Sequence, residues 1–221
     1  MLLQKLDSRI LNYIIEKQIP PGEKLPSLTD ISSELGISVG KLREQLEVAR
    51  NLGLVSVRPR VGIQRQEFNF APPVLQSVLF GLATKEANFE QYSRLRRSVE
   101  ASFWHDAVVL LTPEDKQMLK ALVQSAWDKL RGEPIHVPNI EHRQLHLLIF
   151  YRLDNPFVQG ILSAYWDAYE ASELTRFVQY QYWIDVWTFH EQIVDALCLE
   201  DFERGRQLLI QHFSLLPKSV D

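Results

Sequence analysis

The sequence contains a single cysteine, Cys198, among its 221 residues. One thiol excludes an internal disulfide framework and a zinc ribbon built from cysteines. Because Cys198 lies in the apolar helical stretch 193–199, we expect it to be buried. The chain also lacks internal repeats and low-complexity tracts, and 46% of its residues are hydrophobic, enough to build proper cores. The composition therefore indicates a folded globular protein rather than a disordered chain.

Long apolar runs are missing as well. No stretch approaches the roughly 18 uninterrupted apolar residues that a membrane-spanning helix needs. The first ten residues carry Lys5, Asp7 and Arg9 among apolar side chains, which is unlike a signal peptide or a membrane anchor. We therefore expect a soluble, cytoplasmic protein with no membrane partner.

The chain has no overall excess of positive charge, since its formal net charge is -4. Residues 1–66, however, hold ten Lys/Arg against seven Asp/Glu, whereas residues 67–221 hold fourteen against twenty-one. The two parts thus carry +3 and -7, which indicates different partners for each. A modest positive balance is weak support for nucleic-acid binding by itself, because charged residues usually cover a solvated face.

Three short helices are predicted at the start of the chain. Apolar residues recur at helical spacing over positions 2–15, and Ile-Pro-Pro-Gly at 19–22 ends this first helix. Ser27 can cap a second helix of about ten residues, which Gly36 ends. Ser38 can cap the third helix. Such closely spaced helices form a helix-turn-helix.

A β hairpin is predicted after the third helix. Residues 54–58 contain β-branched side chains in an alternating apolar and polar pattern, which is typical of a strand. Residues 59–62 can form a turn, and 63–66 can return as a second strand. Helix-turn-helix and hairpin together make residues 1–66 a winged helix-turn-helix domain. Residues 67–74, with two prolines in a row, depart from both patterns and are expected to be a linker.

The remainder, residues 75–221, is predicted to be helical throughout. Thr-Pro-Glu at 112–114 and Asp-Asn-Pro at 154–156 are typical helix starts, with a capping side chain and proline in the first turn. The expected helices span 87–111, 112–130, 139–153, 156–169, 182–199 and 201–213. We therefore predict a mainly α protein, in which the winged domain precedes an all-α antiparallel bundle of six or seven helices.

The third helix carries the side chains suited to reading DNA. A recognition helix places the residues near its N-terminus against base edges, while flanking groups hold phosphates. Lys41 and Arg43 are early polar residues here, and the planar fork of Arg43 can pair with guanine O6 and N7. The alternative is that Arg43 and Arg50 are only exposed helix residues. Caps, turn, helix and basic wing occur together in order, which favours DNA binding.

This segment resembles the GntR family of regulators. The resemblance rests on Pro21-Gly22-Glu23-Lys24-Leu25-Pro26-Ser27, Leu35-Gly36-Ile37-Ser38, Leu42-Arg43-Glu44-Gln45-Leu46 and Gly53-Leu54-Val55. Thr29 and Val39 stand where this family commonly has a basic residue, so two of its DNA contacts are missing here. The resemblance also implies that the tip of the wing approaches the minor groove.

The residues expected to bind DNA are Ser27, Ser38, Lys41, Arg43, Arg50, Arg58, Arg60 and Gly62. The expected partner is a double-stranded operator, bound as a near-palindrome by a homodimer.

Four histidines of the helical part have a spacing that suits a metal. His142 and His146 are four residues apart on one helix, and His190 and His212 fall on the last two helices. Facing helices of a bundle can bring such rings together. Imidazole binds zinc, nickel, copper and iron, so the spacing does not select the ion. Taken singly, each histidine is as well explained as a packing residue.

The helical part is similar to the ligand-binding domain of FadR-type GntR regulators. The matching residues are His142-Arg143-Gln144-Leu145-His146, Asp154-Asn155-Pro156, Phe189-His190-Glu191 and His212. Metal-binding members of that group use one aspartate and three histidines, and His142 occupies the position of the aspartate. The resemblance implies a divalent transition metal, zinc or nickel, held by His142, His146, His190 and His212. The fourth imidazole removes one negative charge from the set. The neighbouring Glu141 lies on a different helix face.

The same resemblance implies an effector. It places an arginine of the first long helix in the pocket, beside metal positions open to water or to the carboxylate of an organic acid. Arg96 is the candidate anion-binding residue. The alternative is an Arg96–Glu100 ion pair, four residues apart on a solvated face, and the sequence leaves both open. The expected function is a transcription regulator whose DNA affinity is controlled by a small ligand, an organic acid.

Two other functions are compatible with parts of the sequence. A metal-dependent hydrolase could use the histidines, but no nucleophile or dedicated general base is evident, and the Glu-x-x-His signature of di-iron sites is absent. A DNA-binding dimer with a purely structural helical domain is the second alternative. We therefore expect a regulator and not an enzyme.

Overall fold

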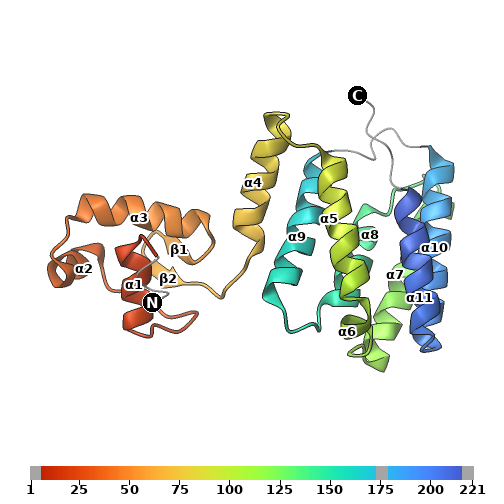
Figure 1. Cartoon of the computed structure of the whole chain (residues 1–221), viewed down its shortest axis with the longest axis horizontal. Helices are drawn as coiled ribbons and strands as arrows, with labels where there is room; N and C mark the ends of the chain where they lie inside the picture. The colour runs from red at the N-terminus through yellow and green to blue at the C-terminus, as the bar shows by residue number, and fades with distance from the viewer. Residues whose placement is uncertain (1–5, 173–178, 216–221) are drawn as a thin grey trace. The chain divides into compact units, whose positions relative to one another are not determined.

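The computed structural model describes residues 6–172 and 179–215. The chain divides into two compact units, Met1–Pro73 and Val74–Asp221 (Figure 1). Each unit has buried hydrophobic residues of its own. Among the described residues, no helix combines the length and the hydropathy that a membrane span requires.

The first unit is a winged helix-turn-helix, as predicted. Its elements are α1 (Arg9–Glu16), α2 (Leu28–Leu35), α3 (Val39–Asn51), β1 (Val55–Arg58) and β2 (Gly62–Arg65). The first helix begins later than expected, because the Ser8 side chain accepts from the backbone N–H of Leu11 and caps it. The part of that expected helix at positions 2–5 lies outside the described residues.

The turn between α2 and α3 depends on two caps and one glycine. The hydroxyl of Ser27 accepts from the backbone N–H of Asp30 at 3.2 Å, and that of Ser38 accepts from Lys41 at 3.3 Å. Gly36 ends α2 at φ +64°, a left-handed conformation that a side chain disfavours. These local bonds set the start of α3 relative to α2. The core beneath them includes Ile10, Ile31, Leu42, Leu46, Ala49 and Ile63.

The wing is wider than the predicted hairpin. Strands β1 and β2 pair antiparallel, from Val55 opposite Arg65 to Arg58 opposite Gly62. The segment before α2 adds a further edge, because the Leu25 N–H donates to the carbonyl of Ile63 at 2.9 Å. The same segment forms an isolated bridge between Lys24 and Gln64. The Pro-Gly-Glu-Lys-Leu-Pro run therefore ties the helices to the wing.

The second unit is a helical bundle, which confirms the predicted fold class. Its helices, the first of which begins three residues before Val74, are α4 (Ala71–Ala83), α5 (Phe89–Ser102), α6 (Trp104–Val108), α7 (Pro113–Arg131), α8 (Asn139–Phe150), α9 (Pro156–Ala171), α10 (Tyr180–Cys198) and α11 (Phe202–His212), followed by a 3-10 turn (Phe213–Leu215). Helix α10 packs against α11 and α7, α7 against α8, and α5 against α9. Helix α4 begins inside the stretch expected to be a linker. Pro72 and Pro73 fit its first turn, where a missing N–H costs nothing.

The single helix expected over 87–111 is wrong, because it is interrupted at Phe103. The break turns Trp104 inward, where it is fully buried and its indole N–H donates to the carbonyl of Phe202 at 2.8 Å. Gly205 of α11 lies against this ring, and a Cβ there would come within 2.8 Å of it. Tertiary packing around Trp104 therefore ends α5 where no proline or glycine signals an end.

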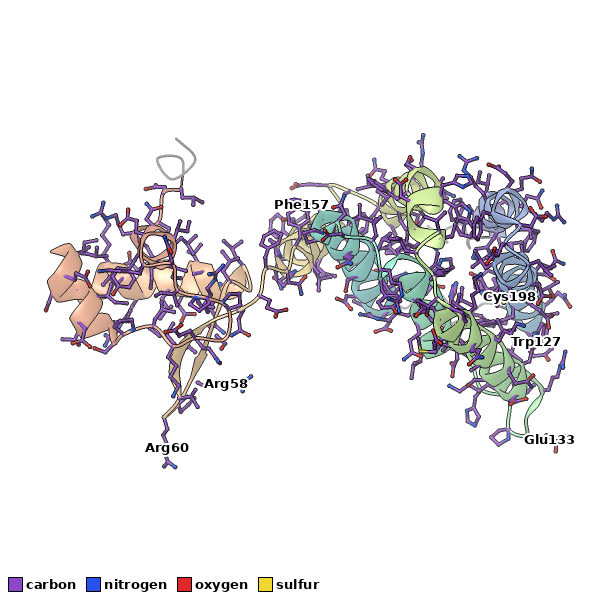
Figure 2. The ribbon with its side chains drawn as sticks, turned by 90° about the horizontal axis from the view of Figure 1, so that it is seen from below. Arg58, Arg60, Trp127, Glu133, Phe157 and Cys198 are labelled. Carbon is purple, nitrogen blue, oxygen red and sulfur yellow. The ribbon has the colours of Figure 1, made fainter. Side chains whose placement is uncertain are left out.

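The prediction of a buried Cys198 is also wrong. The thiol is only half-buried at the end of α10, a position that Figure 2 labels. Ile193, Val194 and Leu197 occupy the inner face of this helix. Cys198 follows Leu197 by one residue, which turns it about 100° away from that face.

A buried carboxylate joins α7 to the end of α8. Asp115, in the first turn of α7, accepts from the backbone N–H of Thr112 at 2.8 Å and from the hydroxyl of Tyr151 at 2.6 Å. It also accepts from the guanidinium of Arg152. The Arg152 hydrogen bonds hold the pKa of Asp115 well below its ordinary value, against the opposing effect of burial.

We expect Asp115→Asn to lower the free energy of unfolding by about 1 to 2 kcal/mol at neutral pH, because it removes charge-assisted hydrogen bonds to a partly exposed Arg152. Since the folded pKa is depressed, the stabilisation is complete above the unfolded carboxyl pKa of about 3.9 and is lost as the pH falls below it. Urea unfolding at neutral pH and near pH 3 measures the difference. Asp128→Asn, an exposed residue of the same helix, is the control. A stability gap of equal size at both pH values would contradict this prediction.

Candidate nucleic-acid interface and metal centre

The start of α3 presents exposed basic side chains. Lys41 and Arg43 lie in its first two turns and both are exposed, as a recognition helix requires. Arg50, at the other end of α3, is exposed but pairs with Glu47, with Nη2 to Oε2 at 2.7 Å. Part of the Arg50 charge is therefore already neutralised within the helix.

A neighbouring polar residue of α3 has a structural role that the sequence did not indicate. The side-chain oxygen of Gln45 accepts from the backbone N–H groups of Arg9 and Ile10, at 2.8 and 3.3 Å. These are otherwise unpaired groups at the start of α1. Gln45 thus fixes α1 against α3, and its oxygen is engaged there.

The wing carries two exposed arginines, Arg58 at the end of β1 and Arg60 in the turn. Figure 2 shows Arg60 at the outer tip of the hairpin, directed away from the helices of its own unit. Gly62, at φ +95°, starts the returning strand in a conformation that favours glycine. Arg65 differs from the other basic residues, because its guanidinium donates to the carbonyl of Ile19 and holds the wing in place. The exposed basic set comprises Lys41, Arg43, Arg58 and Arg60, with Arg50 beside Glu47.

The structure brings the four candidate histidines together in the second unit. His142 and His146 come from α8, His190 from α10 and His212 from α11, and none is more than 5% exposed. One nitrogen of each ring lies within 4.8 Å of the corresponding nitrogens of the others. The Nε2 atoms of His146 and His190 are 3.1 Å apart. Two nitrogens bound tetrahedrally at about 2.0–2.1 Å from one ion would be separated by roughly 3.3 Å, so the spacing of this one pair suits a shared ion.

The protonation of these rings also suits a metal. Burial is the main cause that lowers the pKa of all four imidazoles below the ordinary value, and the rings and Arg96 add positive charge to one another's surroundings. Neutral imidazole is the form that binds metal. Both ring nitrogens of His142 and the Nδ1 atoms of His190 and His212 are buried without a hydrogen-bond partner. A coordinated ion would satisfy one nitrogen of each ring, so these residues fit the metal that the family resemblance implies.

Arg96 lies beside this cluster on α5. Its Nε donates to Oε1 of Glu100 at 2.9 Å, and its Nη2 is 2.9 Å from Nδ1 of His146. The guanidinium lies over the rings of Tyr165 and Trp166, 4.9 and 5.0 Å from their centres. The Arg96–Glu100 pair expected as an alternative is present, but both residues are buried, so the solvated face expected for it is wrong. Arg96 is therefore a buried cation next to the histidines.

Glu141 takes no part in the cluster, although it is next to His142 in the chain. Its carboxylate accepts from the hydroxyl of Ser125 at 2.9 Å and pairs with Lys129 at 2.7 Å. The Lys129 and Ser125 hydrogen bonds help to lower its pKa against the opposing effect of burial, which is the largest single influence. Glu141 belongs to a contact between α7 and α8.

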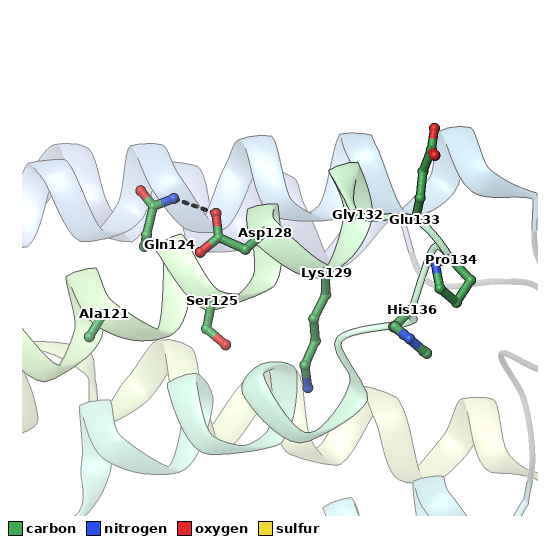
Figure 3. A pocket seen from close by; sticks show the side chains of 9 residues that line it. All are labelled: Ala121, Gln124, Ser125, Asp128, Lys129, Gly132, Glu133, Pro134 and His136. Carbon is green, nitrogen blue, oxygen red and sulfur yellow. Dashed lines mark hydrogen bonds between the residues drawn. The ribbon is translucent and has the colours of Figure 1, made fainter.

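Two surface pockets lie elsewhere on the second unit. Figure 3 shows one of about 550 Å³, lined by Ala121, Gln124, Ser125, Asp128, Lys129, Gly132, Glu133, Pro134 and His136. The other, of about 570 Å³, is more apolar and is lined by Met118, Ala121, Leu122, Gln144, Leu147, Leu148 and Tyr151. None of the four clustered histidines lines either pocket, so the chemistry of the cluster belongs to the interior of the bundle.

Comparison with protein families decides the kind of protein. Residues 91–215 match the FCD domain, and residues 2–64 match the bacterial regulatory proteins of the gntR family. This chain belongs to the GntR family. The matches cover both units and agree with a winged helix-turn-helix followed by a helical effector-binding domain. The GntR protein is accordingly a DNA-binding transcription regulator with an FCD effector-binding domain.

Individual relatives of this GntR regulator are distant. It is 22% identical to the uncharacterized HTH-type transcriptional regulator YcbG of Bacillus subtilis, over 99% of this chain and 90% of that protein. It is 24% identical to the putative L-lactate dehydrogenase operon regulatory protein of Escherichia coli, over 99% and 86%. A solved structure of Streptococcus agalactiae GntR has a TM-score of 0.67 at 18% identity and covers 94% of each chain. The two curated relatives are named as transcription regulators. The comparisons therefore do not support the metal-dependent hydrolase that was considered as an alternative.

Proposed function

We propose that this GntR regulator binds its operator as a homodimer and that a small carboxylate, bound beside a divalent metal, controls its operator affinity. In this proposal residues 1–66 bind DNA, 67–74 connect the domains, and 75–221 bind the effector and dimerise. The observation that carries the proposal is the cluster of four buried imidazoles, three of which, His142, His190 and His212, have unpartnered nitrogens. Buried polar atoms without partners are rare in folded proteins and call for an explanation.

His142, His146, His190 and His212 would hold the metal, and zinc or nickel suits an all-imidazole set. The ion would supply positive charge and a coordination position for a carboxylate oxygen. Because His142 replaces an aspartate, the four protein ligands are neutral and leave the double charge of the ion uncompensated. An anionic effector would restore the balance, and Arg96 lies beside the cluster to bind its second oxygen.

The name of one relative suggests which class of effector to test first. The E. coli protein is named for an operon of L-lactate dehydrogenase, an enzyme that acts on a 2-hydroxy carboxylate. Short 2-hydroxy carboxylates are therefore the first compounds to test.

The direct experiment combines elemental analysis of the purified protein with operator titrations. We expect stoichiometric divalent metal, and we expect L-lactate to change operator affinity while its uncharged amide does not, because only the acid offers a carboxylate to Arg96 and the metal. Two negative results together would instead support a purely structural helical domain. The protein would hold no metal after zinc or nickel loading, and no short carboxylate would change its operator affinity.

We also expect the protein to be a dimer in solution, because one recognition helix reads only a few base pairs and two-fold symmetry doubles the site. Light scattering gives the mass, and footprinting on a near-palindromic operator gives the spacing of the two protected half-sites. That spacing should be one helical turn of DNA or a multiple of it. A strictly monomeric protein with full operator affinity would contradict this part of the proposal.

A further inference from the structure

The more apolar of the two surface pockets lies between α7 and α8, and we name it the α7–α8 groove. Its volume is about 570 Å³. Six apolar or aromatic side chains from these two helices and the residue after α8 line it, namely Met118, Ala121, Leu122, Leu147, Leu148 and Tyr151. Ala121, which Figure 3 labels, also lines the more polar pocket, so the two hollows adjoin along α7.

The side chains of the groove belong to a contiguous apolar patch. Met118 and Tyr151 are 47% and 43% exposed. Gln144 lines the groove as well, and Ile140, four residues earlier on the same face of α8, extends the patch at 59% exposure. Single exposed apolar residues are common on protein surfaces, whereas a contiguous apolar patch marks an interaction site.

The charges beside the groove are already compensated within the unit. No charged residue lines the groove itself. Helix α8 has two acidic or basic residues apart from its histidines. One is Glu141, which pairs with Lys129 at 2.7 Å, and the other is Arg143, which pairs with Asp167. The exposed face of α8 therefore has no unpaired carboxylate or guanidinium to select an acidic or a basic partner, and it suits a neutral apolar one.

A second copy of the chain is a partner of this kind. In a two-fold contact the same patch is used by both subunits, so a charge near the axis would meet the same charge. Like charges placed opposite each other across an interface are costly, and a neutral apolar face avoids that cost. Two helices that pack against the same two helices of a partner also form a four-helix arrangement with an apolar centre.

We propose that two copies of this regulator dimerise by packing their α7–α8 grooves against each other about a two-fold axis. This inference rests on the homodimer of the proposed function and deepens it by naming the face of contact. The buried His142 and His146 also belong to α8. One helix would therefore contribute both to the proposed metal site and to the contact with the partner.

Lysine substitutions in the groove test the contact in the full-length protein without DNA. Sedimentation measures the Kd of dimerisation. We expect Met118→Lys to raise this Kd about 100-fold, because the two-fold axis brings two added charges together at an apolar surface. Gln144→Lys should raise it about tenfold, since this position is already polar. Leu95→Lys on α5 is the matched control, with 48% exposure against 47% for Met118, and should leave the Kd unchanged.

Cross-linking gives a second measurement that does not depend on a weakened dimer. Cys198 is the only cysteine of the chain, so a Cys198→Ser background lets one introduced thiol report on its surroundings. In this background we expect Gln144→Cys to form covalent dimers with a flexible bismaleimide, because the two grooves face each other. Leu95→Cys in the same background should remain monomeric on a denaturing gel.

Failure of this inference and failure of the proposed homodimer give different results. A wild-type dimer whose Kd neither groove lysine changes, and whose Gln144→Cys form does not cross-link, would overturn the α7–α8 contact and leave the homodimer standing. The groove would then be open to a different apolar occupant. A wild-type protein that is monomeric would overturn both the contact and the homodimer.

Discussion

Removing the proposed metal from this GntR regulator is expected to lower its melting temperature by about 5–10 °C. A ligand that binds only the folded state at a free concentration 100 times its Kd adds about 2.7 kcal/mol to the free energy of unfolding. In a domain of roughly this size, each kcal/mol shifts the melting temperature by about 2–4 °C. The ion would join α8, α10 and α11, so the effect should appear in the unfolding of the helical unit. Calorimetry of zinc-loaded and chelator-dialysed protein measures it.

Variants of the cluster identify the site. His146→Gln and His190→Gln each remove one buried imidazole, and we expect them to abolish the difference between loaded and dialysed protein while the dimer persists. His105→Gln is the matched control, because His105 is exposed and pairs with Glu203 outside the cluster. A chelator-dependent shift that survives in both cluster variants would place the metal somewhere else.

Arg43→Ala is expected to relax the choice of base at one position of each half-site, at a cost of about 1–3 kcal/mol for the preferred base pair. The reason is that Arg43 is exposed near the start of α3, and its two-pronged guanidinium distinguishes guanine in the major groove. Arg58→Ala and Arg60→Ala should instead weaken binding evenly across sequences. Each should also reduce the slope of log operator affinity against log salt concentration by about one, as loss of a phosphate contact does.

These two effects are separated by titrating single-base operator variants at several salt concentrations. Lys17→Ala is a suitable control, since Lys17 lies outside α3 and the wing and pairs with Glu34. If Arg58 or Arg60 controlled base choice and Arg43 only the salt slope, the reading element would be the wing rather than α3.

Local signals explain why the winged domain could be predicted. Ser27, Gly36 and Ser38 each act within a few residues of their own position, through capping bonds and a left-handed turn. The β-branched stretch that starts the wing likewise forms a strand where it was expected. The match to the gntR family covers the same residues. In contrast, the roles of Gln45 and Arg65 depend on α1 and on Ile19, which are distant in sequence.

The helical unit shows the same division between local and long-range causes. Amphipathic spacing and proline-bearing helix starts by themselves determined most of its helices, and the i, i+4 spacing placed His142 and His146 on one face. Only the tertiary arrangement of α8, α10 and α11 within the unit decided that His190 and His212 meet those two rings. Packing also decided that α5 ends before Trp104 and that Arg96 is buried with Glu100 against His146. The physical reason is that a helix forms from contacts within four residues, whereas burial and the pairing of charges depend on which helices lie opposite, and that is a property of the whole folded unit.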